Sequence, residues 1–247
     1  GQALQQYLQR NIFFRDEVKL EALNPTTNQF NLHGPNADAI ADSLHPGAAQ
    51  LPPLHGVEAT IAGTAVWLAR DKAYSGTHWL LIVPADQAQN VWTAILAAGA
   101  AHGLIPAGSL TFNTLRIEAG RPGVGREFSE DFIPLELGLW DEVNFHKGCY
   151  TGQEIIARME SRNRLAKTIV RLKLNEAITV PADLLHEGKR AGTLTSSVTA
   201  PDGSILAIGV VKPSLAAPGQ TLQTASAQAT IVDLPGVQPP GLNDSTD

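Results

Sequence analysis

The first two thirds of the chain alternate between segments whose apolar residues have helical spacing and segments with the pattern of extended strands. The predicted helices are a first one around Leu4, Tyr7 and Leu8, a second over 37–44 with Asn36 as its cap, and an alanine-rich third from 84 to about 98. The predicted extended segments are 16–23, 29–33, strands within 57–83, and 111–119. A turn cluster at 24–28 joins the first two into a predicted hairpin. Strands interleaved with helices indicate an α+β region.

From Lys167 onward the pattern changes to short β-prone runs separated by turn residues. These runs are 168–174, 190–198, 205–212 and 221–233. Their spacing predicts a small antiparallel barrel or sandwich. The last stretch is polar and rich in proline and glycine, which predicts a loose tail. We therefore predict an α+β region over 1–164, a C-terminal β-barrel domain over 165–234 and a flexible tail over 235–247.

Composition narrows the function classes. The chain has 247 residues, 43% of them hydrophobic, and a formal net charge of -6. An acidic balance argues against a dedicated nucleic-acid binder, whose affinity depends on neutralising phosphates. A single cysteine cannot form an internal disulfide, which favours a reducing, cytoplasmic compartment. No apolar run reaches the roughly 18 residues of a membrane span, so no membrane association is predicted.

The chain starts at Gly1, directly inside a helical pattern and without an initiator methionine. This start predicts that an N-terminal portion is missing. Tag removal or trimming of a natural start is the alternative.

The segment 147–154 carries the only cysteine of the chain. Its residues are Lys147, Gly148, Cys149, Tyr150, Thr151, Gly152, Gln153 and Glu154. Thr151 and Glu154 have the spacing of a capping box, in which each side chain bonds an amide at the start of a helix. Tyr150 and Ile155 have the spacing of a hydrophobic staple. These signals predict a helix that begins at the cap and runs towards Arg164.

Three features of this segment favour the ionised form of the Cys149 thiol. They are the free amides of the helix start, the positive end of the helix dipole and the ammonium of Lys147. Gly148 and Gly152 let the backbone bend or a ligand approach closely. The alternative is that Cys149 is a small buried hydrophobe. The residues alone leave both interpretations open.

Arg116 and Glu118 form a second candidate site. On a strand, residues two apart project from the same face. An ionised carboxylate accepts two parallel N–H donors, the arrangement that the amino-pyrimidinone edge of a pterin or guanine presents. Taken alone, an exposed surface ion pair is the more frequent explanation of such a pattern.

Residues 158–173 form a local cluster of positive charge. The cluster contains Arg158, Arg162, Arg164, Lys167, Arg171 and Lys173 against the single acid Glu160. It could receive an acidic ligand tail such as polyglutamate, or a phosphate backbone. A solvated face that balances an acidic remainder is an equally good explanation.

No intrinsic metal site is predicted. The seven histidines have no metal-ligand spacing, and one cysteine cannot complete a thiolate cage. A bridging or transient iron–sulfur cluster at Cys149 would need further ligands from a second chain or a small molecule.

The motifs together resemble a known family. Residues 147–159 resemble the signature of the YgfZ-type folate-binding proteins, relatives of the glycine-cleavage T-protein (aminomethyltransferase) that support iron–sulfur protein assembly or repair. Residues 115–122 and 132–136 resemble the core shared by the T-protein superfamily, and 192–197 with 207–211 resemble its C-terminal barrel. The resemblance covers the chain from about residue 1 to 235.

The resemblance implies a ring of modules around a central hole that holds tetrahydrofolate. It implies that Glu118 binds the pterin, with Arg116 and Lys147 as further candidate contacts, and that Lys147 and Cys149 are needed for function. Family members carry a further N-terminal module that contributes to the folate cavity and, in aminomethyltransferases, supplies a catalytic aspartate. This sequence does not include that module. Aminomethyltransferases lack the octapeptide of 147–154, which favours the YgfZ side.

Three hypotheses on function follow, in order of preference. The first is a tetrahydrofolate-binding accessory protein for iron–sulfur cluster assembly or repair, with Cys149 and Lys147 as catalytic residues and iron–sulfur client or assembly proteins as partners. The second is one-carbon transfer from an aminomethyl donor. The third is a folate-dependent tRNA-modification factor that docks through 158–173, which the net charge disfavours. A monomer is expected.

Overall fold

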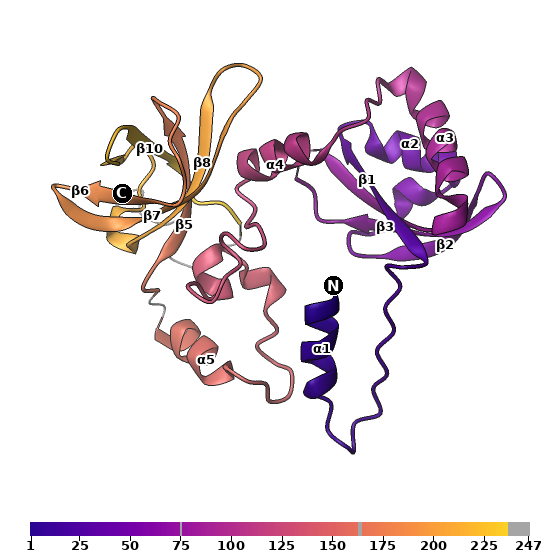
Figure 1. Cartoon of the computed structure of the whole chain (residues 1–247), viewed down its shortest axis with the longest axis horizontal. Helices are drawn as coiled ribbons and strands as arrows, with labels where there is room; N and C mark the ends of the chain where they lie inside the picture. The colour runs from indigo at the N-terminus through magenta and orange to yellow at the C-terminus, as the bar shows by residue number, and fades with distance from the viewer. Residues whose placement is uncertain (75, 163–164, 237–247) are drawn as a thin grey trace. The chain divides into compact units, whose positions relative to one another are not determined.

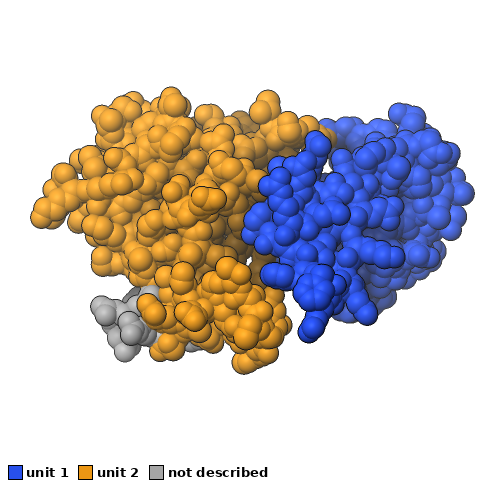
Figure 2. Space-filling model, turned by 60° about the horizontal axis from the view of Figure 1, so that its bottom comes forward, with its two compact units in different colours: residues 1–106 blue, residues 107–247 orange. Residues whose placement is uncertain are grey.

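The computed structural model describes residues 1–74, 76–162 and 165–236 of the chain. The chain forms two compact units, residues 1–106 and 107–247, which Figure 2 shows in different colours. The β-strands of the predicted barrel lie in the second unit, together with the segment that begins at residue 107. The regions predicted from sequence have a boundary at 164/165. They therefore group residues 107–164 with the first region, whereas the two units group them with the barrel.

The first unit is built on a four-stranded antiparallel sheet in the order β1-β4-β3-β2 (Figure 1). The strands are β1 (Thr27–Gly34), β2 (Gly56–Ile61), β3 (Thr64–Asp71) and β4 (Thr77–Pro84). The helices are α1 (Gln2–Arg10), α2 (Ala37–Leu44) and α3 (Ala88–Gly99), with single turns of 3-10 helix at η1 (Ala48–Gln50), η2 (Ala85–Gln87) and η3 (Ala100–His102). Helices α2 and α3 share one core with the sheet, where Leu68, Trp79 and Leu81 are fully buried. The predicted helices are therefore confirmed.

The predicted hairpin of 16–23 with 29–33 is wrong. Residues 16–23 contain no strand, and β1 pairs antiparallel with β4, so that Thr27 lies opposite Pro84 and Gly34 opposite Thr77. An isolated two-stranded hairpin is marginal in water, whereas pairing with β4 adds β1 to a sheet that carries the core. Leu32 of β1 is buried there, while Val18 and Leu23 are exposed.

Asn36 precedes α2 as predicted, but its side chain does not cap the helix. Its amide nitrogen donates instead to the carbonyl oxygen of His102 at 3.1 Å. Asn36 therefore ties the start of α2 to the turn that follows α3.

No helix within the described ranges has both the length and the apolar character to cross a bilayer.

The second unit contains a closed antiparallel barrel in the strand order β10-β5-β8-β7-β6-β9. The strands are β5 (Thr168–Leu174), β6 (Ala182–His186), β7 (Lys189–Thr199), β8 (Ile205–Val211), β9 (Thr221–Gln223) and β10 (Gln228–Asp233). A 3-10 turn, η6 (Pro213–Leu215), follows β8. The predicted barrel is confirmed, although β6 was not predicted and the run 221–233 is two strands. Thr224 closes the turn between them, because its hydroxyl accepts the Ala227 N–H at 2.9 Å.

Among the described residues of the second unit, four helical segments precede the barrel. They are α4 (Ser109–Glu118), η4 (Pro134–Leu137), η5 (Trp140–Glu142) and α5 (Gln153–Arg162). The prediction that 111–119 is extended is wrong. Ile117 of α4 is buried in one cluster with Ile208 and Val210 of the barrel. This burial outweighs the β-preference of the threonines and isoleucine in the segment.

The predicted tail begins with packed residues. Pro235 is buried, and a Cβ at Gly120 would lie 2.3 Å from the Cβ of Pro235, so only glycine fits beside it. Residues 237–247 of the predicted tail lie outside the described residues, as do 163 and 164 at the end of the predicted helix.

Candidate functional site

The loop between η5 and α5 carries the cysteine motif. Its start is a turn in which Oδ1 of Asn144 accepts the backbone N–H groups of His146, at 2.9 Å, and Lys147, at 3.0 Å. Cys149 follows in irregular backbone, and its side chain is exposed. The alternative that Cys149 is a buried core residue is therefore wrong.

Helix α5 begins one residue later than the capping box requires. The first i to i+4 bond runs from the N–H of Ile156 to the carbonyl of Gly152 at 3.3 Å, which makes Gly152 the cap. Thr151 therefore lies before the cap, and the predicted box of Thr151 with Glu154 is wrong. Gly152 has φ +89°, a left-handed conformation that favours glycine.

Lys147 and Tyr150 contact each other across Cys149. The Lys147 ammonium lies 4.9 Å from the centroid of the Tyr150 ring, a cation–π distance. The Tyr150 hydroxyl is buried, and no described residue hydrogen-bonds to it. The contact packs the ammonium of Lys147 against Tyr150, and Lys147 is two positions before Cys149 in the sequence.

A pocket of about 310 Å³ adjoins this loop. Its apolar wall comes from Ile133, Pro134, Val143, Ile155 and Ile156. Lys147, Tyr150, Thr151 and Gly152 of the motif also line it. The motif loop and the start of α5 thus form one side of a small, mostly apolar pocket with a few polar atoms, which is the usual composition of a ligand site.

Glu136 closely follows Ile133 and Pro134, which line this pocket, and it was not among the predicted site residues. The side chain is 5% exposed, and burial raises the pKa of its carboxyl. The backbone N–H of Ile133, which donates to Oε2 at 3.3 Å, and the charge of Lys167 act in the opposite direction. A buried carboxyl near a pocket is a recognised signature of functional sites. The sequence offered no signal for it, because its burial depends on the packing of η4.

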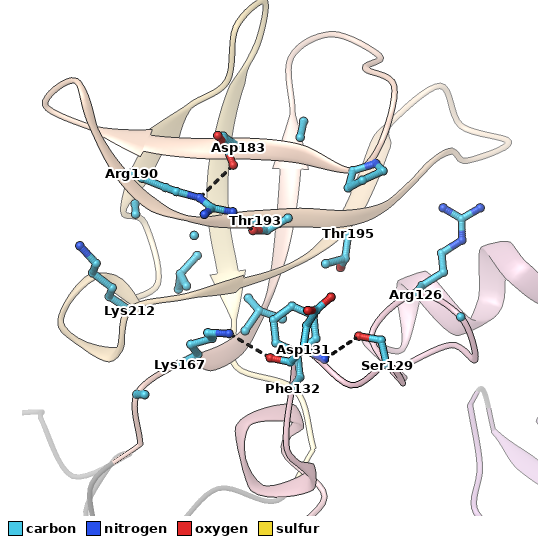
Figure 3. A pocket seen from close by; sticks show the side chains of 18 residues that line it. Arg126, Ser129, Asp131, Phe132, Lys167, Asp183, Arg190, Thr193, Thr195 and Lys212 are labelled. Carbon is cyan, nitrogen blue, oxygen red and sulfur yellow. Dashed lines mark hydrogen bonds and ion pairs between the residues drawn. The ribbon is translucent and has the colours of Figure 1, made fainter.

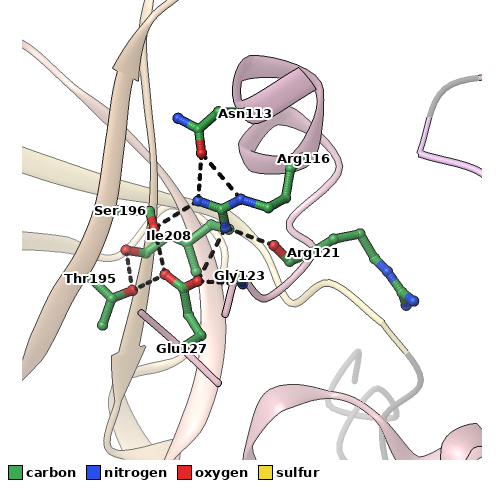
Figure 4. A network of polar contacts seen from close by, with 8 residues as sticks. All are labelled: Asn113, Arg116, Arg121, Gly123, Glu127, Thr195, Ser196 and Ile208. Carbon is green, nitrogen blue, oxygen red and sulfur yellow. Dashed lines mark hydrogen bonds and ion pairs between the residues drawn. The ribbon is translucent and has the colours of Figure 1, made fainter. Parts of the chain in front are cut away.

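A buried polar network joins α4 to the barrel (Figure 4). Glu127 has no exposed surface, and its Oε2 accepts from Nη1 of Arg116 at 3.1 Å and from the Gly123 N–H at 2.8 Å. Its Oε1 lies 2.5 Å from the Thr195 hydroxyl and 2.7 Å from the Ser196 hydroxyl. Every oxygen of this buried carboxylate is hydrogen-bonded, as a buried charge requires.

Arg116 and Glu118 lie on different faces of α4, and only Arg116 belongs to the network. On a helix, residues two apart do not share a face, so the prediction of a common strand face is wrong. Arg116 points into the network and also donates to the Arg121 carbonyl at 2.9 Å. Glu118 is exposed, and no described hydrogen bond uses its carboxylate. Its carbonyl oxygen accepts from Arg171, so its backbone is held while its side chain is accessible.

The predicted cation cluster of 158–173 is partly neutralised. Arg171 pairs with Asp233, with its Nε donating to Oδ1 at 2.7 Å, and this bond raises the pKa of Arg171. Lys167 donates to the Asp131 carbonyl at 3.0 Å. Arg164 and the side chain of Arg162 lie outside the described residues.

The sequence profile of the GCVT N-terminal domain matches residues 2–147. The chain belongs to the GCVT family, the T-protein superfamily. The match to this profile includes Arg116, Glu118 and Glu127 but ends at Lys147. Cys149 and α5 of this GCVT-family chain therefore lie outside the residues that this profile matches.

Individual relatives of this GCVT-family protein support the same assignment. A chloroplastic protein of Arabidopsis thaliana, named as a transferase, is 30% identical over 251 residues, covering 99% of this chain and 57% of the relative. The aminomethyltransferase of Moorella thermoacetica is 29% identical over 225 residues, covering 88% of this chain and 62% of the relative. The chain thus spans less than two thirds of the length of these relatives.

The fold of the GCVT-family chain is also found in a solved structure. The crystal structure of glycine cleavage system aminomethyltransferase T from Bartonella henselae superposes with a TM-score of 0.77 at 23% sequence identity. The match covers 94% of this chain and 64% of that chain. The predicted T-protein-like α+β fold with a C-terminal antiparallel barrel is confirmed.

Proposed function

We propose that this GCVT-family protein binds tetrahydrofolate and uses Cys149 as a functional thiol in the assembly or repair of iron–sulfur proteins. The observation that carries the proposal is an exposed Cys149 in a loop that also carries the ammonium of Lys147 and leads into α5 at Gln153. The cytoplasmic location and the monomeric state stay predictions.

Glu118 supports the folate half of the proposal. Its carboxylate is exposed at the end of α4, and an ionised carboxylate accepts two parallel N–H donors of the kind that a pterin edge presents. Arg116 does not fit a direct contact, because its guanidinium is buried in the network with Glu127. We assign Arg116 a positioning role for the end of α4. Tetrahydrofolate, when bound, supplies reduced ring nitrogens that carry one-carbon units.

Cys149 and the resemblance of 147–159 to the YgfZ signature support the iron–sulfur half. A thiolate is the usual protein ligand of iron–sulfur clusters and also the reactive form of cysteine in redox chemistry. The ammonium of Lys147, packed on the Tyr150 ring, lies in the same loop as the exposed sulfur. In this proposal the iron–sulfur cluster belongs to the client protein and is not a resident cofactor of this chain.

The test separates the two halves. Full-length protein is titrated with tetrahydrofolate, comparing the wild type with Glu118→Gln, Cys149→Ser and the control Glu130→Gln at another exposed glutamate. We expect Glu118→Gln to weaken binding about tenfold or more, since hydrogen bonds to a charged group contribute about 1.5–3 kcal/mol. Cys149→Ser should bind normally and fail to restore iron–sulfur enzyme activity in cells that lack the protein. Equal binding by Glu118→Gln and Glu130→Gln would refute the folate contact.

Aminomethyl transfer is the second candidate function, because curated relatives such as that of Moorella thermoacetica are named aminomethyltransferase. Full-length protein should then form one-carbon-loaded tetrahydrofolate from a lipoyl-linked aminomethyl donor. This turnover should persist in Cys149→Ser. Absence of turnover in the wild type removes this candidate.

A further inference from the structure

A large pocket lies within the second unit, apart from the motif loop and Glu118 (Figure 3). Its volume is about 1100 Å³. Strands β6, β7 and β8 line one side, and the segments 125–132 and 166–167 line the other. All of its lining residues belong to the unit that begins at residue 107, so the pocket is a feature of that unit alone.

The charge of this pocket opposes the charge of the whole chain. Its charged lining residues are Arg126, Asp131, Lys167, Asp183, Arg190 and Lys212. Four cations therefore face two carboxylates, while the chain as a whole has a formal net charge of -6. A concave surface with walls of one sign attracts ligands of the other sign.

The two carboxylates leave the pocket lining with an excess of positive charge. Asp183 pairs with Arg190 at 2.9 Å, but both side chains are more than half exposed, and such surface pairs are weak and easily exchanged. The Lys167 ammonium bonds a neutral carbonyl oxygen, that of Asp131, and lies 4.8 Å from the centroid of the Phe132 ring.

Arg126 and Lys212 complete the positive lining. Both side chains are exposed, and neither forms an ion pair with a residue that the structure describes. A guanidinium presents parallel N–H donors that match a carboxylate or a phosphate, and an ammonium acts as a point charge for either anion.

The arrangement of the cations indicates the shape of the ligand. In Figure 3, Lys212, Lys167 and Arg190 lie towards one side of the pocket and Arg126 towards the other. Val210, Val211 and Ala191 add apolar surface to the lining. The Thr193 hydroxyl accepts from Nη2 of Arg190 at 3.1 Å, which leaves its proton for a bound acceptor. A ligand that fits carries anionic groups at separate positions and an uncharged part between them.

We propose that this pocket is a binding site for a small molecule or short chain that carries two or more carboxylate or phosphate groups. The site goes beyond the proposed folate and thiol functions and uses none of their residues. Carboxylates and phosphates share the chemistry that the pocket recognises, and the experiment below distinguishes them.

The test uses two probes that contain no pterin, inorganic pyrophosphate and tri-glutamate, in calorimetric titrations of the full-length protein at low salt. We expect at least one probe to bind with a submillimolar Kd. The double variant Arg126→Gln/Lys212→Gln should bind it at least tenfold more weakly. The matched control Arg10→Gln/Lys19→Gln removes the same charge from exposed positions of the first unit and should change the Kd less than twofold.

Selective binding of pyrophosphate would assign the site to phosphates, and selective binding of tri-glutamate would assign it to polycarboxylates. Failure of both probes overturns the proposal, and so does an equal loss in the two double variants. The four mutated side chains are exposed, so their replacement should leave the thermal unfolding temperature unchanged. Because neither probe contains a pterin, this result is independent of whether tetrahydrofolate binds.

Discussion

Nη1 of Arg116 donates to Oε2 of Glu127 at 3.1 Å, and Glu127 has no exposed surface. This buried pair fixes the last turns of α4 to β7, since Nη2 of Arg116 also donates to the Ser196 hydroxyl at 3.0 Å. The exposed carboxylate of Glu118 is two residues further along the same helix. The position of the proposed folate contact therefore depends on a charge pair that is buried from solvent.

Glu127→Gln should destabilise the protein by about 3 kcal/mol, because it leaves the buried Arg116 without its countercharge. The free energy of unfolding in urea measures this effect. Glu130→Gln, at an exposed glutamate in the same segment, is the control and should change stability by less than about 0.5 kcal/mol. A loss of similar size in both variants would show that the pair is not what stabilises this region.

Acid should destabilise the first unit through His33. The pKa of His33 is lowered from 6.5 to about 4, mainly by burial and also by the charge of His78, while Asp71 opposes the shift. Because the unfolded chain takes up this proton at a higher pH than the folded chain, stability is full above about pH 6.5 and falls as the pH drops towards 4. We expect a loss of the order of 1–2 kcal/mol after allowance for solvent screening of a half-buried ring.

His33→Phe keeps the ring stacking on His78, whose centroid lies 4.0 Å away, and removes the titrating group. Its free energy of unfolding should change less between pH 7 and pH 4.5 than that of the wild type. The control His146→Gln, at an exposed ring, should retain the acid sensitivity. Identical pH profiles for the wild type and His33→Phe would contradict the assignment.

Glu136 should produce the opposite pH dependence in the second unit. Because burial raises the pKa of this carboxyl in the folded state, its contribution to stability is full at acid pH and declines as the pH rises through the folded-state pKa. The difference in unfolding free energy between Glu136→Gln and the wild type should therefore shift in favour of Glu136→Gln when the pH is raised from 4 to 8. Urea unfolding at the two pH values measures the difference, and a constant offset between the two proteins would refute it.

The two glycines of the motif loop should respond differently to alanine. Gly152 has φ +89°, so Gly152→Ala should cost about 1 kcal/mol or slightly more at the start of α5. Gly148 has no left-handed φ and no atom within 4 Å of the position of an added Cβ, so Gly148→Ala should be nearly neutral. Equal losses in thermal stability would show that the cap at Gly152 is misplaced.

Local sequence patterns were sufficient for the elements that bury one face against nearby chain. The apolar spacing of α2 and α3 and the short β-prone runs of the barrel predicted those elements within a few residues. The octapeptide also marked a loop that leads into a helix, because glycines and a helix start are local signals.

Long-range burial decided the rest. Residues 111–119 have a local preference for extended structure, yet most of them belong to α4, because a helix places Ile117 beside Ile208 and Val210 of β8, about ninety residues away in sequence. The same choice buries Arg116 with Glu127 and exposes Glu118, so two neighbouring faces of one helix carry a structural residue and a candidate ligand contact. The two pockets and the charge of the larger one arise only when segments distant in sequence are packed together. The sequence by itself therefore determined the elements whose apolar pattern is local, such as α2, α3 and most strands of the barrel. The tertiary structure decided which of their polar side chains reach solvent, since burial of a charge depends on partners that local sequence does not contain.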